Sequence, residues 1–215
     1  MNSITDDLHA MREHYEQAPL RKADLNACPL KQFSVWLGDA VSAKVYDPNA
    51  CSLSTVNSQG QPFARAVLLK ALEDGQFIFY TNYNSRKASH LKQNPNACLH
   101  FPWLALQRQV VVTGTASKID SLRAEEYFNS RPLQSRLGAW ASSQSEEVDS
   151  RESLEKSYLD AKEKFGGDPP KPPHWGGYAL TPETIEFWQG GPSRLHDRFF
   201  YQSLENSWSI RRLNP

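Results

Sequence analysis

Five short stretches rich in β-branched, aromatic and other apolar residues follow one another between residues 51 and 119, and they limit the fold more than any other feature. They are CSLSTV, FARAVLLKAL, FIFYT, ACLHFPW and RQVVVTGTASKI. NSQGQP and EDGQ separate the first three, and turns of this kind, bearing glycine, are typical of antiparallel hairpins. The pattern predicts an antiparallel meander or barrel.

Helical patterns surround these stretches. From Pro29, a residue suited to a first helical turn, apolar side chains recur at helical spacing. They are Leu30, Phe33, Leu37, Ala40 and Val41. Residues 84–95 predict a second helix, capped by Asn84 or Ser85 and stopped by Pro95. Two more are predicted, over 121–132 with Ser121 as N-cap and over 150–165.

The chain ends in three expected strands, YALTPETIEFWQ, HDRFFYQ and WSIRRL, with LEN as the turn between the last two. The Pro- and Gly-rich GGDPPKPPHWGG is too short to separate domains. Residues 1–28 read as a polar arm with one helical segment around Leu8 to Tyr15. We therefore expect an α+β chain, with this arm and a single domain over residues 29–215 centred on an antiparallel β-barrel.

Charge narrows the possible partners. Lys plus Arg and Asp plus Glu both number 24, so the net charge is zero, which disfavours non-specific binding to nucleic acid or a membrane surface. Apolar runs such as AVLL fall far short of the roughly 20 residues that a membrane span needs. The start lacks the order of a signal peptide, so we expect a cytoplasmic protein. The cysteines form no C-x-x-C pair and no H-E-x-x-H occurs, so no metal is expected.

In a chain with zero net charge, local groups of cations are informative. RAVLLK places Arg65, Val67 and Leu69 on one face of a strand and Ala66, Leu68 and Lys70 on the other. Arg86 and Lys87 open a helix, where backbone N–H groups favour a phosphate and cations oppose the helix dipole. Each group is either an anion contact or a solvated end.

Two further groups carry polar chemistry. Gln107 and Gln109 precede the VVV run, and an amide can both donate to and accept from the edge of a heterocycle. Tyr127 and Arg131 lie four apart on the third predicted helix, with Ser135 just past the stop at Pro132. A phenol, a guanidinium and a hydroxyl that converge would form a phosphate cup.

The stretch IEFWQGGPSRLHDR, residues 185–198, is the fifth group. If its second half is extended, Arg194, His196 and Arg198 share one face. These groups repel one another unless an anion or an electron-rich ring lies over them, and a solvated outer face is the alternative. Together the five groups indicate two anionic ligands, although neither a Walker loop nor G-x-G-x-x-G is present.

The same stretch resembles the signature of the pyridoxine/pyridoxamine 5′-phosphate oxidases. RAVLLK, FYTNYNSRKA, FPWLALQRQV, YFNSRP, GAWASSQS and HWGG follow in that family's order, so the resemblance runs from about Arg12 to Pro215. It implies an FMN-dependent split-barrel homodimer with the flavin in a cleft between the subunits. The implied reaction oxidises pyridoxine 5′-phosphate or pyridoxamine 5′-phosphate to pyridoxal 5′-phosphate and reduces O2 to hydrogen peroxide.

The resemblance also implies roles for residues. Those expected to bind the cofactor are Arg65, Ala66, Val67, Leu68, Leu69, Lys70, Tyr80, Thr81, Arg86, Lys87, Gln109, Gln144, Ser145, Trp188 and Arg198. Those expected to bind the substrate are Arg12, Tyr15, Lys70, Tyr127, Arg131, Ser135, Arg194, Leu195 and His196. Arg194 and His196 are the catalytic candidates. The arm reads PLRKAD where the family has a denser Arg run.

Two other functions remain open. The chain could be a non-catalytic carrier of FMN or pyridoxal phosphate, or a split-barrel flavin reductase with another substrate. The cup of Tyr127, Arg131 and Ser135 favours a substrate with a phosphate. A nucleic-acid role through SIRRLNP is disfavoured by the zero net charge.

Overall fold

The computed structural model describes residues 8, 15 and 17–215, whose contacts divide into two compact units. The first unit comprises the chain up to Pro48 together with Pro102–Val111 and Thr184–Pro215. The second comprises Asn49–Phe101 and Val112–Glu183. Most of the helical segment expected around Leu8 to Tyr15 lies outside the described residues.

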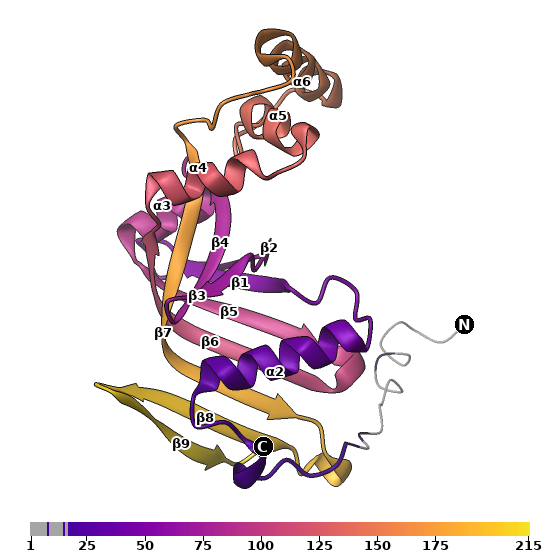
Figure 1. Cartoon of the computed structure of the whole chain (residues 1–215), viewed down its shortest axis with the longest axis vertical. Helices are drawn as coiled ribbons and strands as arrows, with labels where there is room; N and C mark the ends of the chain where they lie inside the picture. The colour runs from indigo at the N-terminus through magenta and orange to yellow at the C-terminus, as the bar shows by residue number, and fades with distance from the viewer. Residues whose placement is uncertain (1–7, 9–14, 16) are drawn as a thin grey trace. The chain divides into compact units, whose positions relative to one another are not determined.

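Nine strands form one sheet in the order β2-β1-β5-β6-β7-β4-β3, with β8 paired to β7 and β9 to β8 (Figure 1). Their bounds are β1 Ala50–Val56, β2 Pro62–Leu68, β3 Ala71–Glu73, β4 Gln76–Asn82, β5 Asn96–Trp103, β6 Arg108–Lys118, β7 Trp175–Gln189, β8 Asp197–Leu204 and β9 Ser207–Leu213. The pairings of β1 with β2 and β5, of β4 with β3 and β7, and of β8 with β7 and β9 are antiparallel. The antiparallel α+β fold predicted from the sequence is confirmed.

The stretch FARAVLLKAL, expected as one strand, is divided between β2 and β3. The backbone N–H of Leu69 donates to the Asn49 carbonyl oxygen at 2.8 Å, and that of Lys70 donates to the Ile78 carbonyl oxygen at 2.8 Å. The chain therefore changes its partner from the β1 side to β4 at this point. Burial still alternates through this change of partner: Arg65 and Val67 are half-buried and Leu69 is buried, while Ala66, Leu68 and Lys70 are exposed, in agreement with the two predicted faces.

Glycine lets two strands of the second unit come close together. A Cβ at Gly114 on β6 would lie 2.0 Å from the carbonyl oxygen of Thr181 on β7, which no side chain can tolerate. The core of this unit contains Leu53, Phe79 and Phe101, all fully buried.

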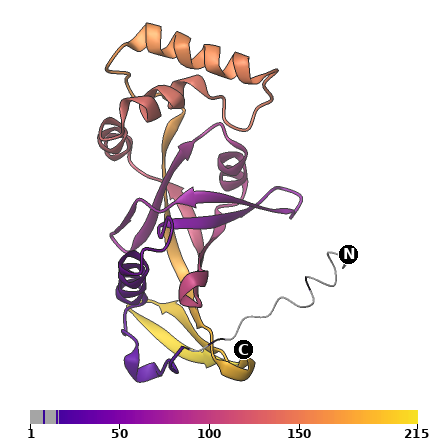
Figure 2. The ribbon, with the colours of Figure 1, turned by 90° about the vertical axis from the view of Figure 1, so that its right-hand side faces the viewer.

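The helices of the second unit are α3 Arg86–Gln93, α4 Ser121–Asn129, α5 Leu133–Ala141 and α6 Arg151–Phe165. Asp120, rather than the expected Ser121, is the N-cap of α4, and its carboxylate accepts from the N–H groups of Leu122 and Arg123. Helix α5 was not predicted, because Pro132 was taken as a stop. Pro132 instead precedes the first turn of α5, where no backbone N–H is required. Figure 2 shows α5 and α6 side by side.

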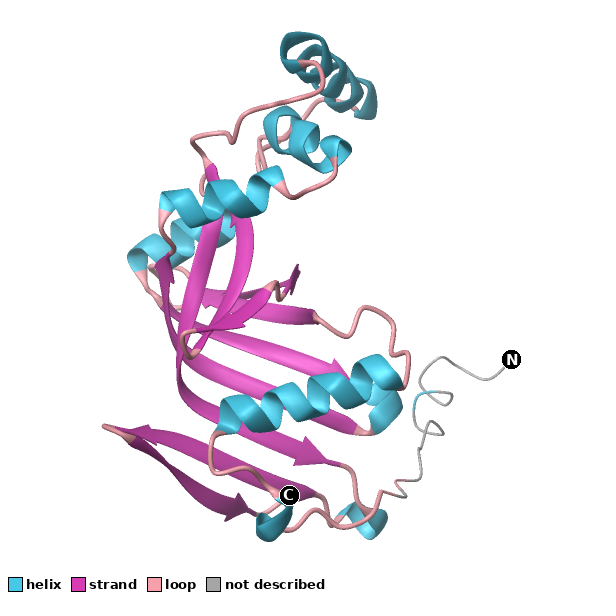
Figure 3. Ribbon diagram, in the orientation of Figure 1, coloured by secondary structure: helices cyan, strands magenta, loops and turns pink. Residues whose placement is uncertain are grey.

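In the first unit, helix α2 (Pro29–Ser42) lies against the strands of the sheet (Figure 3). It buries Phe33 and Trp36, which contact Trp103 and Phe187 respectively. Trp36 takes the place on the apolar face that the sequence pattern gave to Val41, which is 58% exposed. The strands β8 and β9 form the expected hairpin. Three short 3-10 turns complete the structure, η1 Lys22–Asp24, η2 Leu104–Leu106 and η3 Pro192–Arg194. No helix in the described part of the chain is long and apolar enough to cross a membrane.

Candidate active site

A polar pocket of about 550 Å³ lies in the second unit. Its walls come from the segment between β2 and β3, from β4, from the end of α4, from α5, from the loop after α5 and from the start of β7. The lining residues are Leu68, Lys70, Tyr80, Thr81, Asn82, Tyr127, Arg131, Pro132, Ser135, Gly138, Ala139, Ser142, Gln144 and Trp175. The volume is within the range of small-molecule and cofactor sites.

All three members of the expected phosphate cup, Tyr127, Arg131 and Ser135, line this pocket, and so does Lys70, which the resemblance also implies for the substrate. The reasoning from helical spacing was nevertheless wrong. Helix α4 ends at Asn129, so Arg131 lies in the turn between α4 and α5, with its N–H donating to the Phe128 carbonyl oxygen. Ser135 belongs to the first turn of α5. The turn at Pro132, and not a shared helix face, brings these groups together.

Arg131 carries the most informative atom of the pocket. Its Nη1 is buried without a hydrogen-bond partner in the described structure. The guanidinium carbon lies 4.7 Å from the centre of the Trp175 ring, and burial lowers the pKa of Arg131. A buried guanidinium N–H without an acceptor is costly, and an anionic ligand in the pocket would remove that cost.

Aromatic rings form one side of the pocket. The ring centroids of Tyr80 and Tyr127 are 3.9 Å apart, and those of Tyr80 and Trp175 are 5.3 Å apart, in stacked geometry. Burial raises the pKa of both phenols, which keeps them neutral donors. Trp175 was not among the predicted site residues, although the quoted motif HWGG contains it. Gly176, next to it, leaves room for the Tyr83 hydroxyl, which would lie 2.2 Å from a Cβ.

A second group of cations, Arg65, Arg86 and Lys87, is connected to the pocket wall through Lys87. Lys87 is 8% exposed, and its Nζ donates to Thr81 Oγ1 at 3.1 Å and to Gln144 Oε1 at 2.8 Å, two residues of the pocket wall. Burial and then the charge of Arg65 lower the pKa of Lys87 to about 8. Burial and Arg86 likewise lower the pKa of Arg65.

These three cations lack the counter-charge that normally accompanies such a group. None of the ion pairs found among the described residues involves Arg65, Arg86 or Lys87. Arg86 and Lys87 occupy the first turn of α3, whose N-cap Ser85 makes no side-chain capping bond and accepts instead from Lys87 Nζ. Free N–H groups and unpaired cations at one helix start favour a phosphate.

Of the other residues of the second unit that were expected to bind the cofactor, some line the pocket and others do not. Leu68 lines the pocket, Ala66 and Val67 lie on β2, and Leu69 is buried. Ser145 follows Gln144 in the loop after α5 and has a positive φ of 76°.

In the first unit, Tyr15, Trp188 and His196 form an aromatic cluster. The His196 ring centroid lies 4.7 Å from that of Trp188 and 5.1 Å from that of Tyr15. His196 Nδ1 accepts from the Gly191 N–H at 3.1 Å. In a neutral ring the proton is therefore on Nε2.

Arg194, His196 and Arg198 do not share a strand face, so that expectation is wrong. Arg194 ends η3 with φ 64°, and β8 begins only at Asp197. Period-two alternation cannot apply before the strand starts. Arg198 is engaged by both carboxylate oxygens of Glu186, at 2.9 and 3.0 Å.

Gln109 lies on β6 within the first unit, and Leu195 is 74% exposed. Arg12 lies outside the described residues.

Comparisons with known proteins identify the family of the chain. The profile of the pyridoxamine 5′-phosphate oxidase family matches residues 37–165, and that of the pyridoxine 5′-phosphate oxidase C-terminal dimerisation region matches residues 175–215. A pyridoxine/pyridoxamine 5′-phosphate oxidase of Ralstonia pickettii is 50% identical over 216 residues, covering 100% of both chains. One of Vibrio cholerae is 48% identical, covering 97% of this chain and 100% of its own.

Two solved structures are also similar. The PhzG protein of Burkholderia lata, crystallised with tetrahydrophenazine-1-carboxylic acid, has a TM-score of 0.88 at 28% identity and covers 94% of this chain and 100% of its own. A pyridoxamine 5′-phosphate oxidase-related, FMN binding protein of Nostoc punctiforme has a TM-score of 0.70 at 20% identity, over 89% of this chain and 100% of its own, which supports the fold alone. On the profile matches and the full-length identity, the chain belongs to the pyridoxine/pyridoxamine 5′-phosphate oxidase family.

Proposed function

We propose that this protein oxidises pyridoxine 5′-phosphate and pyridoxamine 5′-phosphate to pyridoxal 5′-phosphate with FMN as cofactor. Two electrons and two protons leave the substrate and reduce O2 to hydrogen peroxide; the amine additionally takes up water and releases ammonia. The names of relatives about 50% identical over the full chain support the substrate class. The observation in the structure that carries the proposal is the buried, unpartnered Nη1 of Arg131.

The pocket fits a substrate phosphate. Lys70 and Arg131 would supply charge, while Tyr127 and Ser135 would supply hydroxyl donors. An unphosphorylated vitamer would leave Arg131 buried without a partner, so the pocket would discriminate against it. The stacked rings of Tyr80 and Trp175 supply flat apolar surface next to this cup.

The second cation group fits the phosphate of FMN, because a dianion would supply the missing counter-charge of Arg65, Arg86 and Lys87. Thr81 and Gln144 would complete that end of the site, and Leu68 and Tyr80 would line it. When bound, FMN supplies the two-electron chemistry that protein side chains lack.

We infer that Arg194 and His196 orient the substrate and handle the proton at its C4′ substituent, with Nε2 of His196 as the ring atom left for that task. Trp188, Arg198 and Gln109 would contact the cofactor.

The arm residues Arg12 and Tyr15 would cover the substrate, and Leu195 would contact it. We also propose a homodimer with FMN at the subunit interface, which the match of residues 175–215 to a dimerisation region supports. A cytoplasmic location is part of the same proposal.

A visible spectrum of the purified protein, followed by anaerobic addition of pyridoxine 5′-phosphate, tests the function. We expect a flavin spectrum whose visible band bleaches with the phosphorylated vitamer and not with pyridoxine. Admission of air should restore the colour and produce peroxide. A flavin that stays oxidised would instead indicate a carrier. Bleaching only by a reduced nicotinamide or another donor would indicate a flavin reductase.

A further inference from the structure

A buried polar chain lies behind Arg65, and the function proposed above does not use it. Arg65 Nη1 donates to Thr55 Oγ1 at 2.7 Å and to the Leu53 carbonyl oxygen at 3.0 Å. Thr55 Oγ1 lies 3.0 Å from His90 Nδ1. Thr55 is fully buried and His90 is 6% exposed, so neither side chain can exchange its partner for bulk water.

The donors and acceptors in this series are fixed at Arg65 and follow the tautomer at His90. A guanidinium can only donate, so Thr55 Oγ1 accepts from Arg65. Burial, followed by the charges of Arg65 and Arg86, lowers the pKa of His90 and so favours a neutral ring. In the neutral ring with its proton on Nε2, Nδ1 accepts from the Thr55 hydroxyl; with its proton on Nδ1, the ring donates to the same oxygen.

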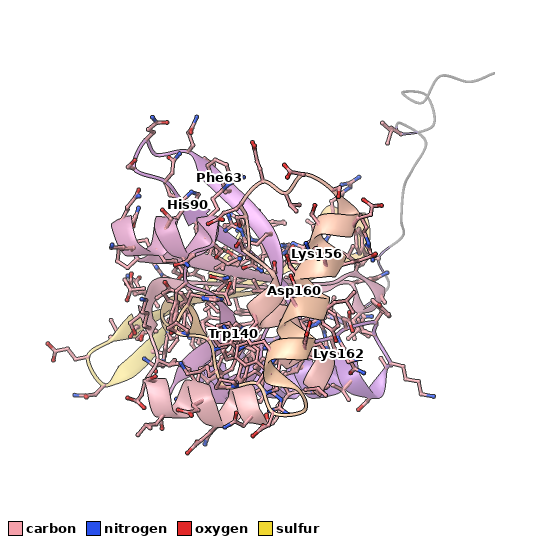
Figure 4. The ribbon with its side chains drawn as sticks, turned by 90° about the horizontal axis from the view of Figure 1, so that it is seen from above. Phe63, His90, Trp140, Lys156, Asp160 and Lys162 are labelled. Atoms are coloured by element: carbon pink, nitrogen blue, oxygen red, sulfur yellow. The ribbon has the colours of Figure 1, made fainter. Side chains whose placement is uncertain are left out.

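The hydrogen bonds among Arg65, Thr55 and His90 also connect the elements that carry the three cations. Arg65 lies on β2, Thr55 on β1, and His90 one turn after Arg86 on α3. The Phe63 ring, 4.9 Å from that of His90 (Figure 4), lies 5.8 Å from the Arg86 guanidinium carbon. The contact between Thr55 and His90 therefore fixes α3, with Arg86 and Lys87, against the strand pair that carries Arg65.

We propose that Thr55 and His90 are positioning residues that hold the Arg65 guanidinium, and its distance from Arg86 and Lys87, for the phosphate of the cofactor. The inference rests on the function proposed above. Neither residue touches the phosphate: Thr55 fixes one nitrogen of Arg65, and His90 fixes the hydroxyl of Thr55. The remaining nitrogens of Arg65 are thereby aimed at a single place rather than free to sample several rotamers.

Riboflavin, which is FMN without its phosphate, separates this role from a general effect on folding. We would titrate apoprotein of each variant with FMN and with riboflavin and follow flavin fluorescence. Thr55→Val keeps the shape but removes a bond to a charged group, so FMN should bind about tenfold more weakly. His90→Leu should have a smaller effect in the same direction. Riboflavin affinity should change less than twofold for both variants, because riboflavin has no phosphate for Arg65 to contact.

Conservative variants and a control complete the design. Thr55→Ser keeps the hydroxyl, and His90→Asn places an amide oxygen near the position of Nδ1, so both should retain most of the FMN affinity. Ser54→Ala, the next residue along β1 and on its other face, should leave both affinities unchanged. In an Arg65→Ala background, Thr55→Val should have no further effect on FMN, because the residue it positions is gone.

Equal losses of FMN and riboflavin affinity would overturn the proposal, and so would an unchanged FMN affinity in Thr55→Val and His90→Leu. If Thr55→Val does not fold, His90→Leu against His90→Asn makes the same comparison. Wild-type protein that binds neither flavin would refute the proposed function itself, which is a different result.

Discussion

Two arginines of the C-terminal hairpin have carboxylate partners, whereas two arginines of the second unit have none among the described residues. In the hairpin, Arg198 is held by both oxygens of Glu186, and Arg212 is paired with the buried carboxylate of Asp197. In the second unit, Arg65 and Arg131, of which Arg131 lines the pocket, have no carboxylate partner among the described residues. Nη1 of Arg131 is buried and has no hydrogen-bond acceptor in the part of the chain that the structure describes.

The difference distinguishes arginines that already have a carboxylate partner in the free protein from arginines that have none among the described residues. A paired arginine is satisfied in the free protein, so removing its partner should cost stability. An unpaired one raises the energy of the free protein and is satisfied only by an anion, so removing it should cost binding. The net charge of zero counts paired and unpaired arginines alike, so it does not distinguish between them.

Arg131→Leu should give the largest effect on activity. The loss of two charge-assisted contacts to a phosphate corresponds to a fall of about 100-fold or more in kcat/KM, mainly through KM. Steady-state oxygen consumption with pyridoxine 5′-phosphate measures it. Arg123→Ala is the matched control, because Arg123 lies on α4 but pairs with Glu73. Equal losses in the two variants would contradict a ligand role for Arg131.

Asp197→Ala should lower stability, in contrast to Arg131→Leu, which should weaken substrate binding. The Asp197 side chain is 7% exposed, pairs with Arg212 and accepts from the Leu20 N–H at 2.8 Å. Its removal should lower the free energy of unfolding by about 2–3 kcal/mol. Denaturant unfolding measures this, with Asp39→Ala as control. The Asp39 side chain is 50% exposed, so its loss should cost less than about 1 kcal/mol. A stable Asp197→Ala protein would refute the structural role.

Lys87 predicts a dependence of cofactor binding on pH. Its pKa is lowered to about 8, so above that pH the free protein loses one charge facing the phosphate. The bound dianion would raise that pKa, so FMN affinity should fall about tenfold between pH 7 and pH 9. Fluorescence titration across that range measures it. Lys87→Arg, whose guanidinium stays charged, should bind FMN with no such fall; a fall that persists would exclude Lys87 as its origin.

Trp175→Leu should give the smallest effect. It removes the ring stacked on Arg131, worth about 1 kcal/mol, so KM should rise about fivefold with kcat nearly unchanged. Trp175→Phe should recover part of the loss. Trp140→Leu is the control, since that indole packs on Phe165 and is not among the residues that line the pocket. A change in kcat alone would mean that Trp175 does not act through substrate binding.

Local patterns were enough to predict most elements. Period-two stretches with Gly-bearing turns predicted β1, β4, β5 and β6, and Pro29 with its helical apolar pattern predicted the start of α2. These signals work because the spacing of apolar residues shows directly which residues share the buried face of a strand or a helix. These signals failed at Pro132, because a proline is found both after the end of one helix and at the start of another. Helix α5, which begins after Pro132, was therefore not predicted.

The sequence by itself determined which groups are available, through its family motifs and the absence of any excess charge. Only the tertiary structure decided which cations are paired. Arg65 and Arg198 look alike in the sequence, yet the carboxylate of Glu186 on the neighbouring strand pairs with Arg198, whereas Arg65 donates to a hydroxyl and a carbonyl oxygen of β1 and has no carboxylate partner among the described residues. The reason is physical: electrostatic pairing and desolvation depend on distances of a few ångströms between residues far apart in the chain, and those distances exist only after folding.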